Sequence, residues 1–104
     1  MDLQILLREL KENLEKVLED EIEEIILYGS YARGDYSKAS DVDILLVVRE
    51  KLDLDKYEKI NEIATELTLK YGVVVSILDY PKDAFMSLDS PFLQSIKREG
   101  IRIE

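Results

Sequence analysis

Apolar residues recur at intervals of three and four positions in two long stretches of the chain, which is the periodicity of an amphipathic helix. Residues 3–19 predict the first helix, with Asp2 placed to act as its N-cap. Residues 53–71 predict the second, and Gly72 stands where a helix commonly ends in a left-handed residue. Each helix is expected to bury one face and to leave the other in water.

Shorter apolar runs predict strands. Residues 24–28 and 73–78 each form one run of strand length. Residues 42–48 are almost continuously apolar, which indicates a central strand that is buried on both of its faces. Residues 101–103 predict a short edge strand at the end of the chain.

Proline and glycine divide the C-terminal part of the chain. Pro81 is expected to begin a short helix or turn over residues 82–88. Pro91 suits the first turn of a further helix over residues 91–99, which Gly100 would end.

The order of these elements predicts one α+β domain over residues 1–104. Its architecture would be a two-layer sandwich, in which a mixed β-sheet has helices packed on one face. Residues 1–20 would form an N-terminal helix, and residues 24–104 would form the core of the domain.

The amino-acid composition limits which side chains can act as a base or a metal ligand, and the chain's apolar runs bear on where the protein is found. The chain has no cysteine and no histidine, so a base or a metal ligand is expected to be a carboxylate. The first residues lack the order of a signal peptide, and no apolar run approaches 18 residues. We therefore expect a soluble, cytoplasmic protein without a membrane contact.

The net charge of −9 bears on the kind of partner. Affinity for nucleic acid comes mainly from neutralising phosphates with Lys and Arg, so direct binding of nucleic acid is not expected. A free nucleotide can still bind, because a divalent cation and a nearby arginine act locally.

One segment carries a pattern that points to chemistry. An apolar run ends at Tyr28 in the pair Gly29-Ser30, and ten residues later Asp41 and Asp43 open the next apolar run. Side chains alternate across a strand, so the two carboxylates point to one face, about 6–7 Å apart, and repel each other. A divalent cation would remove that repulsion, and Mg²⁺ favours one or two protein carboxylates together with substrate phosphates. The alternative is a pair of solvated carboxylates, which the burial expected for Asp43 disfavours.

The turn before the two aspartates suits a phosphate. Gly29 lets the backbone approach closely, and Ser30 would cap a short helical turn through Arg33. Gly34 is either a second position of close approach or the C-cap of that turn, and the C-cap is favoured. Arg33 could neutralise the leaving pyrophosphate, or it could pair with Asp35 or another acidic residue on the surface.

The motif of Gly-Ser, ten residues and Asp-x-Asp resembles that of the minimal nucleotidyltransferases of the polymerase-β superfamily. The segment Ala32-Arg33-Gly34 also matches the pattern usual in that family. The resemblance extends loosely to the C-terminus and leaves out the first helix, about residues 2–20. It implies the same α+β fold and Mg²⁺ as cofactor, with Mn²⁺ as an alternative. The implied metal-binding and catalytic residues are Asp41 and Asp43, and the implied nucleotide-binding residues are Gly29, Ser30 and Arg33.

The resemblance also implies an activity, the transfer of a nucleoside monophosphate from an NTP, ATP above all, to a hydroxyl. Larger relatives have a helical domain that shapes the acceptor site, and 104 residues leave no room for it. Minimal members frequently accompany a small helical HEPN protein as the antitoxin of a toxin–antitoxin pair, where the acceptor is a toxin tyrosine. We therefore expect a small, basic, HEPN-type partner. A homo-oligomer stays open.

The sequence departs from the family pattern at one position. Active members usually have a third acidic residue on the next strand. Aligning that strand by its apolar residues puts Ser76 at the position, while Asp79 falls on the opposite face unless a bulge turns it inward. Asp35 could substitute from the loop, although a role in the turn is favoured. The departure keeps a second function open, a nucleotide-binding module that acts by protein–protein contact with weak or no catalysis.

Overall fold

The computed structural model describes residues 1–87 and 89–104 and contains a four-stranded sheet in the order β3-β2-β1-β4. Strand β2 pairs antiparallel with β1 and parallel with β3, and the short β4 pairs antiparallel with β1. The mixed sheet expected from the order of elements is therefore confirmed. The strands are β1 (Ile22–Tyr28), β2 (Val42–Val48), β3 (Val75–Pro81) and β4 (Ile101–Arg102).

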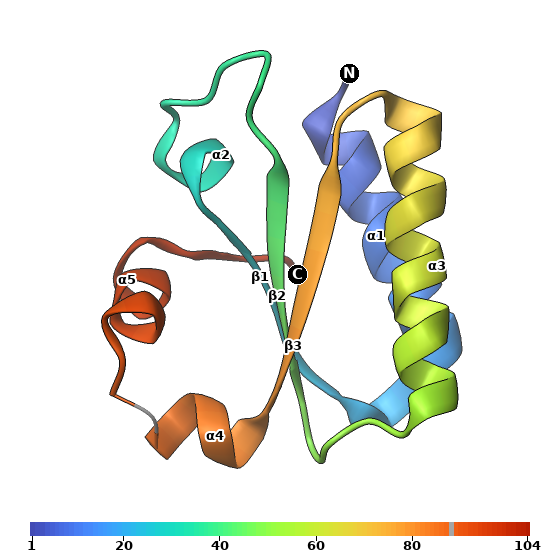
Figure 1. Ribbon diagram of the computed structural model, residues 1–104, viewed down its shortest axis with the longest axis vertical. Helices are drawn as coiled ribbons and strands as arrows, with labels where there is room; N and C mark the ends of the chain where they lie inside the picture. Colours follow the sequence, from blue (N-terminus) through green and yellow to red (C-terminus); the bar gives the residue numbers. More distant parts are fainter. Residues whose placement is uncertain (88) are drawn as a thin grey trace.

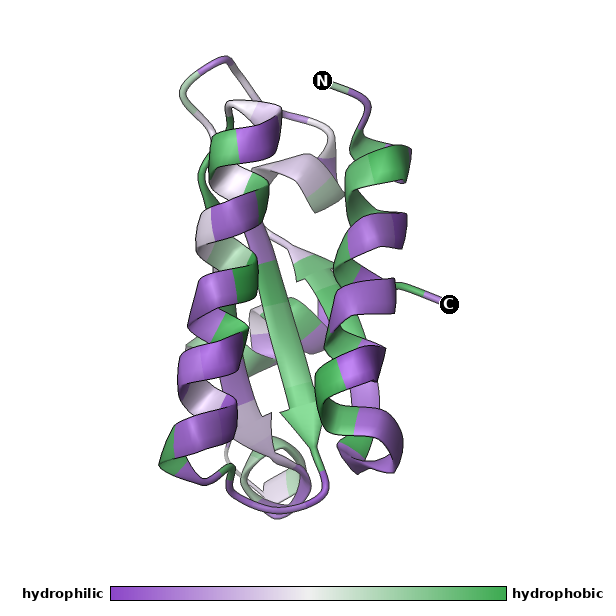
Figure 2. Cartoon of the chain, turned by 90° about the vertical axis from the view of Figure 1, so that its right-hand side faces the viewer, coloured by the Kyte–Doolittle hydropathy of each residue, from purple (hydrophilic) through white to green (hydrophobic). Residues whose placement is uncertain are grey.

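The two long helices, α1 (Leu3–Leu18) and α3 (Leu54–Tyr71), lie side by side on one face of the sheet (Figure 1). Their outward sides are largely hydrophilic, and the hydrophobic strand between them lies behind (Figure 2). The apolar residues that the three- and four-residue spacing singled out form the main core together with alternate residues of β2. Its fully buried side chains include Leu6, Leu10, Leu14, Ile44, Leu46, Ile60 and Leu67.

The opposite face of the sheet is also covered in part. Three shorter helices lie on that side (Figure 1). They are α2 (Ser30–Arg33), α4 (Lys82–Ser87) and α5 (Pro91–Glu99), and a 3₁₀ turn, Glu19–Glu21, follows α1. Leu93 and Ile96 of α5 pack on Leu45 and Val47 of β2 in a second, smaller core. The expectation of helices on one face thus holds for the two long helices, α1 and α3, while the shorter helices lie on the other side. Because β2 is apolar on both faces, each face needs a cover.

Element ends follow from local chemistry. The Asp2 side chain accepts hydrogen bonds from the N–H groups of Gln4 and Ile5 and caps α1, as predicted. Gly72 ends α3 in the left-handed region, with φ of 70°. Strand β3 begins at Val75 and not at residue 73, and Leu88, the last residue of the helix expected over 82–88, lies outside the described residues.

Strand β3 forms one edge of the sheet, and a helix residue occupies the start of that edge. The Thr68 hydroxyl of α3 accepts a hydrogen bond from the Val75 N–H at 2.9 Å and donates to the Ala64 carbonyl at 2.8 Å. Within residues 1–87 and 89–104, no helix has the length and apolar character needed to cross a bilayer.

Candidate active site

Tyr28, Asp43 and Ser76 lie beside one another on three adjacent strands. Tyr28 pairs with Asp43 between β1 and β2, and Asp43 pairs with Ser76 between β2 and β3. Because side chains alternate along a strand, Asp43 points to the same face as Leu45, which packs in the smaller core with α5. The site therefore lies on the α5 face of the sheet, at the end where β1 finishes and β2 begins.

Asp41 and Asp43 are close enough to influence each other. Partial burial, first, and the negative charge of Asp41, second, raise the pKa of the Asp43 carboxyl above its ordinary value of 3.8, while the Arg33 guanidinium opposes them. Asp41 is exposed just before the strand, and Asp43 is half-buried within it. Because the two negative charges repel each other, a cation bound near both carboxylates would be stabilised.

Gly29 faces the carboxylate of Asp43 directly. Its φ is +79°, in the region that favours glycine, and a Cβ at this position would lie 2.5 Å from Asp43 Oδ2. A side chain here would strain the backbone and would push the Asp43 carboxylate aside. The missing side chain therefore lets the backbone of the turn lie directly against the Asp43 carboxylate.

The turn after Gly29 forms α2 with one difference from the prediction. Gly29, and not Ser30, is the N-cap residue, and Ser30 is the first helical residue without a side-chain cap hydrogen bond. The Gly29 carbonyl accepts from the N–H groups of Ala32 and Arg33. Gly34 has φ of 86° and donates its N–H to the Ser30 carbonyl, so its predicted role as C-cap is confirmed.

Arg33 makes ion pairs with two carboxylates at the surface. Its Nε lies 3.2 Å from Asp35 Oδ2, and its Nη1 lies 3.7 Å from Glu99 Oε2 on α5. Both alternatives for Arg33 stay compatible with this geometry, because the pairs are partly exposed and their charges can be exchanged for a phosphate. Asp35 is engaged with Arg33, in agreement with its favoured role in the turn.

The third acidic position is occupied by Ser76, as the alignment predicted. Strand β3 runs in unbroken parallel register with β2, and Asp79 lies opposite Leu46. Asp79 is thus on the face that α1 and α3 cover, and the structure does not bring it to Asp43. Within residues 1–87 and 89–104, no group of three acidic side chains is placed to hold a metal ion.

Helix α5 contributes residues that the sequence did not single out. The Tyr28 ring meets the Phe92 ring edge to face, with centroids 5.6 Å apart. Burial, first, and the charge of Asp43, second, raise the pKa of the Tyr28 phenol. A cleft of about 230 Å³ opens between the turn and the helix, lined by Tyr28, Gly29, Arg33, Phe92, Ser95, Ile96 and Glu99. Helical spacing alone could not show which strand end α5 would adjoin.

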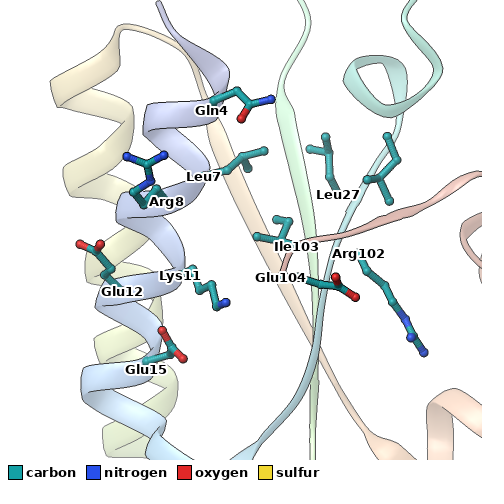
Figure 3. A pocket seen from close by; sticks show the side chains of 11 residues that line it. Gln4, Leu7, Arg8, Lys11, Glu12, Glu15, Leu27, Arg102, Ile103 and Glu104 are labelled. Atoms are coloured by element: carbon teal, nitrogen blue, oxygen red, sulfur yellow. The ribbon is translucent and has the colours of Figure 1, made fainter.

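Another cleft lies away from these residues, between α1 and the end of the chain (Figure 3). It has a volume of about 450 Å³ and a mixed lining, with Leu7 and Ile103 among its apolar residues and Arg8 and Glu12 among its charged ones. None of the predicted site residues lines it.

The residues at the site fit a divalent cation that substrate phosphates help to hold. Asp41 and Asp43 supply two carboxylates, and Mg²⁺ accepts such incomplete protein coordination when phosphates and water complete it. The repulsion that raises the pKa of Asp43 is the feature that a cation would relieve. Two carboxylates beside a glycine turn can therefore bind a metal together with a phosphate chain.

Known proteins are similar to this chain in sequence and in fold. A family model described as "Nucleotidyltransferase domain" matches residues 4–102, which includes α1, the helix that the motif-based resemblance left out. A protein of Methanocaldococcus jannaschii described as "Putative protein adenylyltransferase" is 34% identical over 103 residues, covering 99% of this chain and 100% of the relative.

Two solved structures show the same fold. One, described as "Structure of putative minimal nucleotidyltransferase", superposes with a TM-score of 0.66 and is 24% identical, covering 99% of this chain and 97% of that one. The other contains a tri-AMPylated HEPN toxin of Shewanella oneidensis in complex with an MNT antitoxin. It superposes with a TM-score of 0.63 and is 20% identical, covering 95% of this chain and 69% of that one.

Proposed function

This chain belongs to the nucleotidyltransferase domain family, and we propose that it transfers AMP from ATP to a hydroxyl of a partner protein, with Mg²⁺ or Mn²⁺ held by Asp41 and Asp43. The observation that carries the proposal is the close approach of the Gly29 backbone to the Asp43 carboxylate, which places the Gly29-Ser30 turn directly beside the aspartate pair. Its relative in Methanocaldococcus jannaschii, described as a "Putative protein adenylyltransferase", supports the choice of donor and acceptor.

The residues act by positioning. The backbone of the Gly29-Ser30 turn receives the β- and γ-phosphates, and Arg33 lies at the end of α2 to neutralise the departing pyrophosphate. The acceptor oxygen forms a bond to the α-phosphorus, the bond from that phosphorus to the bridging oxygen breaks, pyrophosphate leaves, and the hydroxyl proton passes to solvent water. A divalent cation held by Asp41 and Asp43 would supply charge neutralisation on the phosphate oxygens. Most of the rate enhancement then comes from alignment, because Ser76 cannot act as a base.

A protein acceptor suits the surface of this chain. Its net charge of −9 opposes a nucleic-acid polymer and favours a basic partner through charge complementarity. The complex that contains an AMPylated HEPN toxin supports a small, helical HEPN-type protein as that partner, with this chain as the antitoxin.

The metal is tested by calorimetric titration of ATP with and without Mg²⁺. We expect tighter binding of ATP with Mg²⁺ and loss of that gain in Asp43→Asn, while Asp79→Asn, on the other face of the sheet, keeps it. Equal ATP affinity with and without metal in the wild-type protein would contradict the proposal.

The acceptor is tested by co-expression with the product of the neighbouring gene, followed by intact mass spectrometry. A mass increase of one or more nucleotides on that protein, absent with Asp43→Asn, is the expected result. Transfer to RNA or to a small molecule, without any complex, would overturn the proposal.

Ser76 supports a second candidate, a nucleotide-binding module that neutralises its partner by contact. The absence of a carboxylate opposite Asp43 in β3 is the observation that favours it. A stable complex without modification of the partner would identify this function in the same experiment.

A further inference from the structure

The outer edge of β3 presents backbone groups that the fold leaves unused. The Val74 carbonyl accepts a hydrogen bond from β2, so the even-numbered residues of β3 face β2 and the odd-numbered ones face outward. Among the described residues, the Thr68 hydroxyl is the one group that bonds this outer side, at the Val75 N–H. The N–H and C=O groups of Ile77 and Asp79 are therefore available to another strand.

The side chains along this edge are apolar at positions where an outer strand commonly carries charge. Leu78 pairs with Leu45, points to the α5 face of the sheet and is 40% exposed. Val74, just before the strand, is 52% exposed. On the α3 side, Leu69 is 81% exposed next to the edge. Apolar side chains beside unused backbone groups indicate an interaction surface.

A groove of about 450 Å³ lies between this edge and α3, which is adjacent to β3 in the fold (Figure 1). Asn61 and Thr65 line the groove, and the same two residues line a second hollow along the outer side of α3. Three glutamates at every fourth position also line that hollow: Glu58, Glu62 and Glu66. The ion pairs that α3 makes within the described part of the chain involve none of these three carboxylates. The outer side of the groove is therefore negatively charged.

We propose that the outer edge of β3 binds an extended segment of a partner protein as a fifth strand, and that this segment alternates basic and apolar residues. The side chains of an added strand point to the two faces of the sheet in turn. On the α3 face they would lie beside the Asp79 carboxylate and the three glutamates, which favours Lys or Arg. On the α5 face they would contact Leu78, which favours an apolar residue. The inference goes beyond the proposed function, because this binding needs neither a nucleotide nor a metal ion.

A second copy of this chain is the rival occupant of the edge. Pairing of two β3 edges would bring the Asp79 carboxylates and the α3 glutamates of both copies together, and each copy has a net charge of −9. Like charges placed across an interface oppose association. Charge therefore favours a basic partner over a second copy.

The test uses a synthetic peptide of about eight residues, a usual strand length, in which lysine and valine alternate. One control peptide has glutamate in place of lysine, and the other has the same composition with all lysines before all valines. Affinity for the full chain is measured by calorimetric titration without nucleotide. Hydrogen exchange of the Ile77 and Asp79 N–H groups is followed by NMR in the same samples.

We expect the alternating lysine peptide to bind and to slow exchange of the Ile77 and Asp79 N–H groups about tenfold or more, because these groups become hydrogen-bonded. The glutamate peptide should not bind. The peptide with separated lysines and valines should bind more weakly and leave that exchange unchanged. Absence of binding by the alternating peptide, or binding without slowed exchange at these two groups, would overturn the inference.

The double variant Glu62→Gln, Glu66→Gln is expected to weaken binding of the alternating peptide about three- to tenfold, because two ion pairs are lost. Glu12→Gln with Glu15→Gln on α1 is the matched control, since it removes the same charge from exposed positions of the neighbouring helix. It should leave the affinity nearly unchanged, and equal weakening by the two double variants would contradict the proposed surface. Slowed exchange at Ile77 that appears without peptide and grows with protein concentration would identify a second copy as the occupant and also overturn the inference.

Discussion

Gly29 and Asp43 meet so closely that a single added carbon on Gly29 would lie 2.5 Å from Asp43 Oδ2. The two residues belong to different strand ends, and the pairing of Tyr28 with Asp43 fixes their distance. The contact joins the turn that would hold phosphates to the carboxylate that would hold the metal. It is the basis of the first prediction.

Gly29→Ala is expected to weaken ATP binding at least tenfold and to lower the free energy of unfolding by about 1–3 kcal/mol, since it combines a strained φ with a contact on Asp43. Gly34→Ala is the matched control, because Gly34 has φ of +86° and nothing within 4 Å of an added Cβ. It should lose a similar amount of stability to strain and keep its ATP affinity. Equal effects on ATP binding from both variants would show that the contact with Asp43 does not matter.

The stability of the metal-free protein is expected to depend on the charge of Asp43. Its pKa is raised in the folded state by burial and by Asp41, so ionisation favours the unfolded state. The stability that the protonated group contributes is present in full below its ordinary value of 3.8 and is lost as pH rises through the folded-state pKa. In chelator at pH 7, Asp43→Asn should therefore melt at a higher temperature than the wild-type protein.

The advantage of that variant should shrink as pH falls through the folded-state pKa of Asp43 towards 3.8. Mg²⁺ with ATP should stabilise the wild-type protein more than the variant. Thermal unfolding across pH, with and without Mg²⁺-ATP, measures both effects. A variant that is less stable than the wild-type protein at pH 7 without metal would contradict the assignment.

Ser76→Asp is expected to raise the transfer rate about tenfold or more, because it places a third carboxylate opposite Asp43, and a positioned base typically contributes about 10²–10⁴-fold. Ser76→Asn, similar in size and uncharged, is the control and should not raise the rate. Asp79→Asn should change the rate little. An essential Asp79 would mean that the working strand departs from the unbroken register.

Arg33→Ala is expected to weaken ATP binding about 10–100-fold while costing less than about 1 kcal/mol of stability, since its ion pairs with Asp35 and Glu99 are partly exposed. Arg49→Ala is the control, because Arg49 also pairs with two acidic residues and lies at the far end of β2. Loss of ATP binding in both variants would indicate an effect of net charge and not a phosphate contact.

Much of the fold could be predicted because the decisive signals are local. The apolar run predicts β2 at residues 42–48, and the structure has Val42–Val48. The two long helices, their caps at Asp2 and Gly72, and the turn Ser30–Arg33 also follow from short-range chemistry. The family expected from Gly29-Ser30 and Asp41-x-Asp43 is confirmed, while the metal and nucleotide roles of these residues stay predictions.

The rest depends on packing between distant segments, which no local pattern encodes. Helix α5 covers the second face of β2 through Leu93 and Ile96, and the sequence shows only that these residues are apolar at helical spacing. The cleft at Phe92 and Ser95 exists because that packing brings α5 beside the turn at Gly29. The identity of the cap at α2 also depends on the φ of Gly29, which its contact with Asp43 constrains.

The hydrogen bond from the Val75 N–H to the Thr68 hydroxyl has a consequence for how this protein behaves in a crowded solution. An outer strand with free N–H groups is a template on which other chains can add strands and aggregate. Here the first of those groups is already occupied by a helix of the same chain. Thr68→Val, which keeps the shape and loses the acceptor, should therefore make the protein more prone to self-association during concentration or heating.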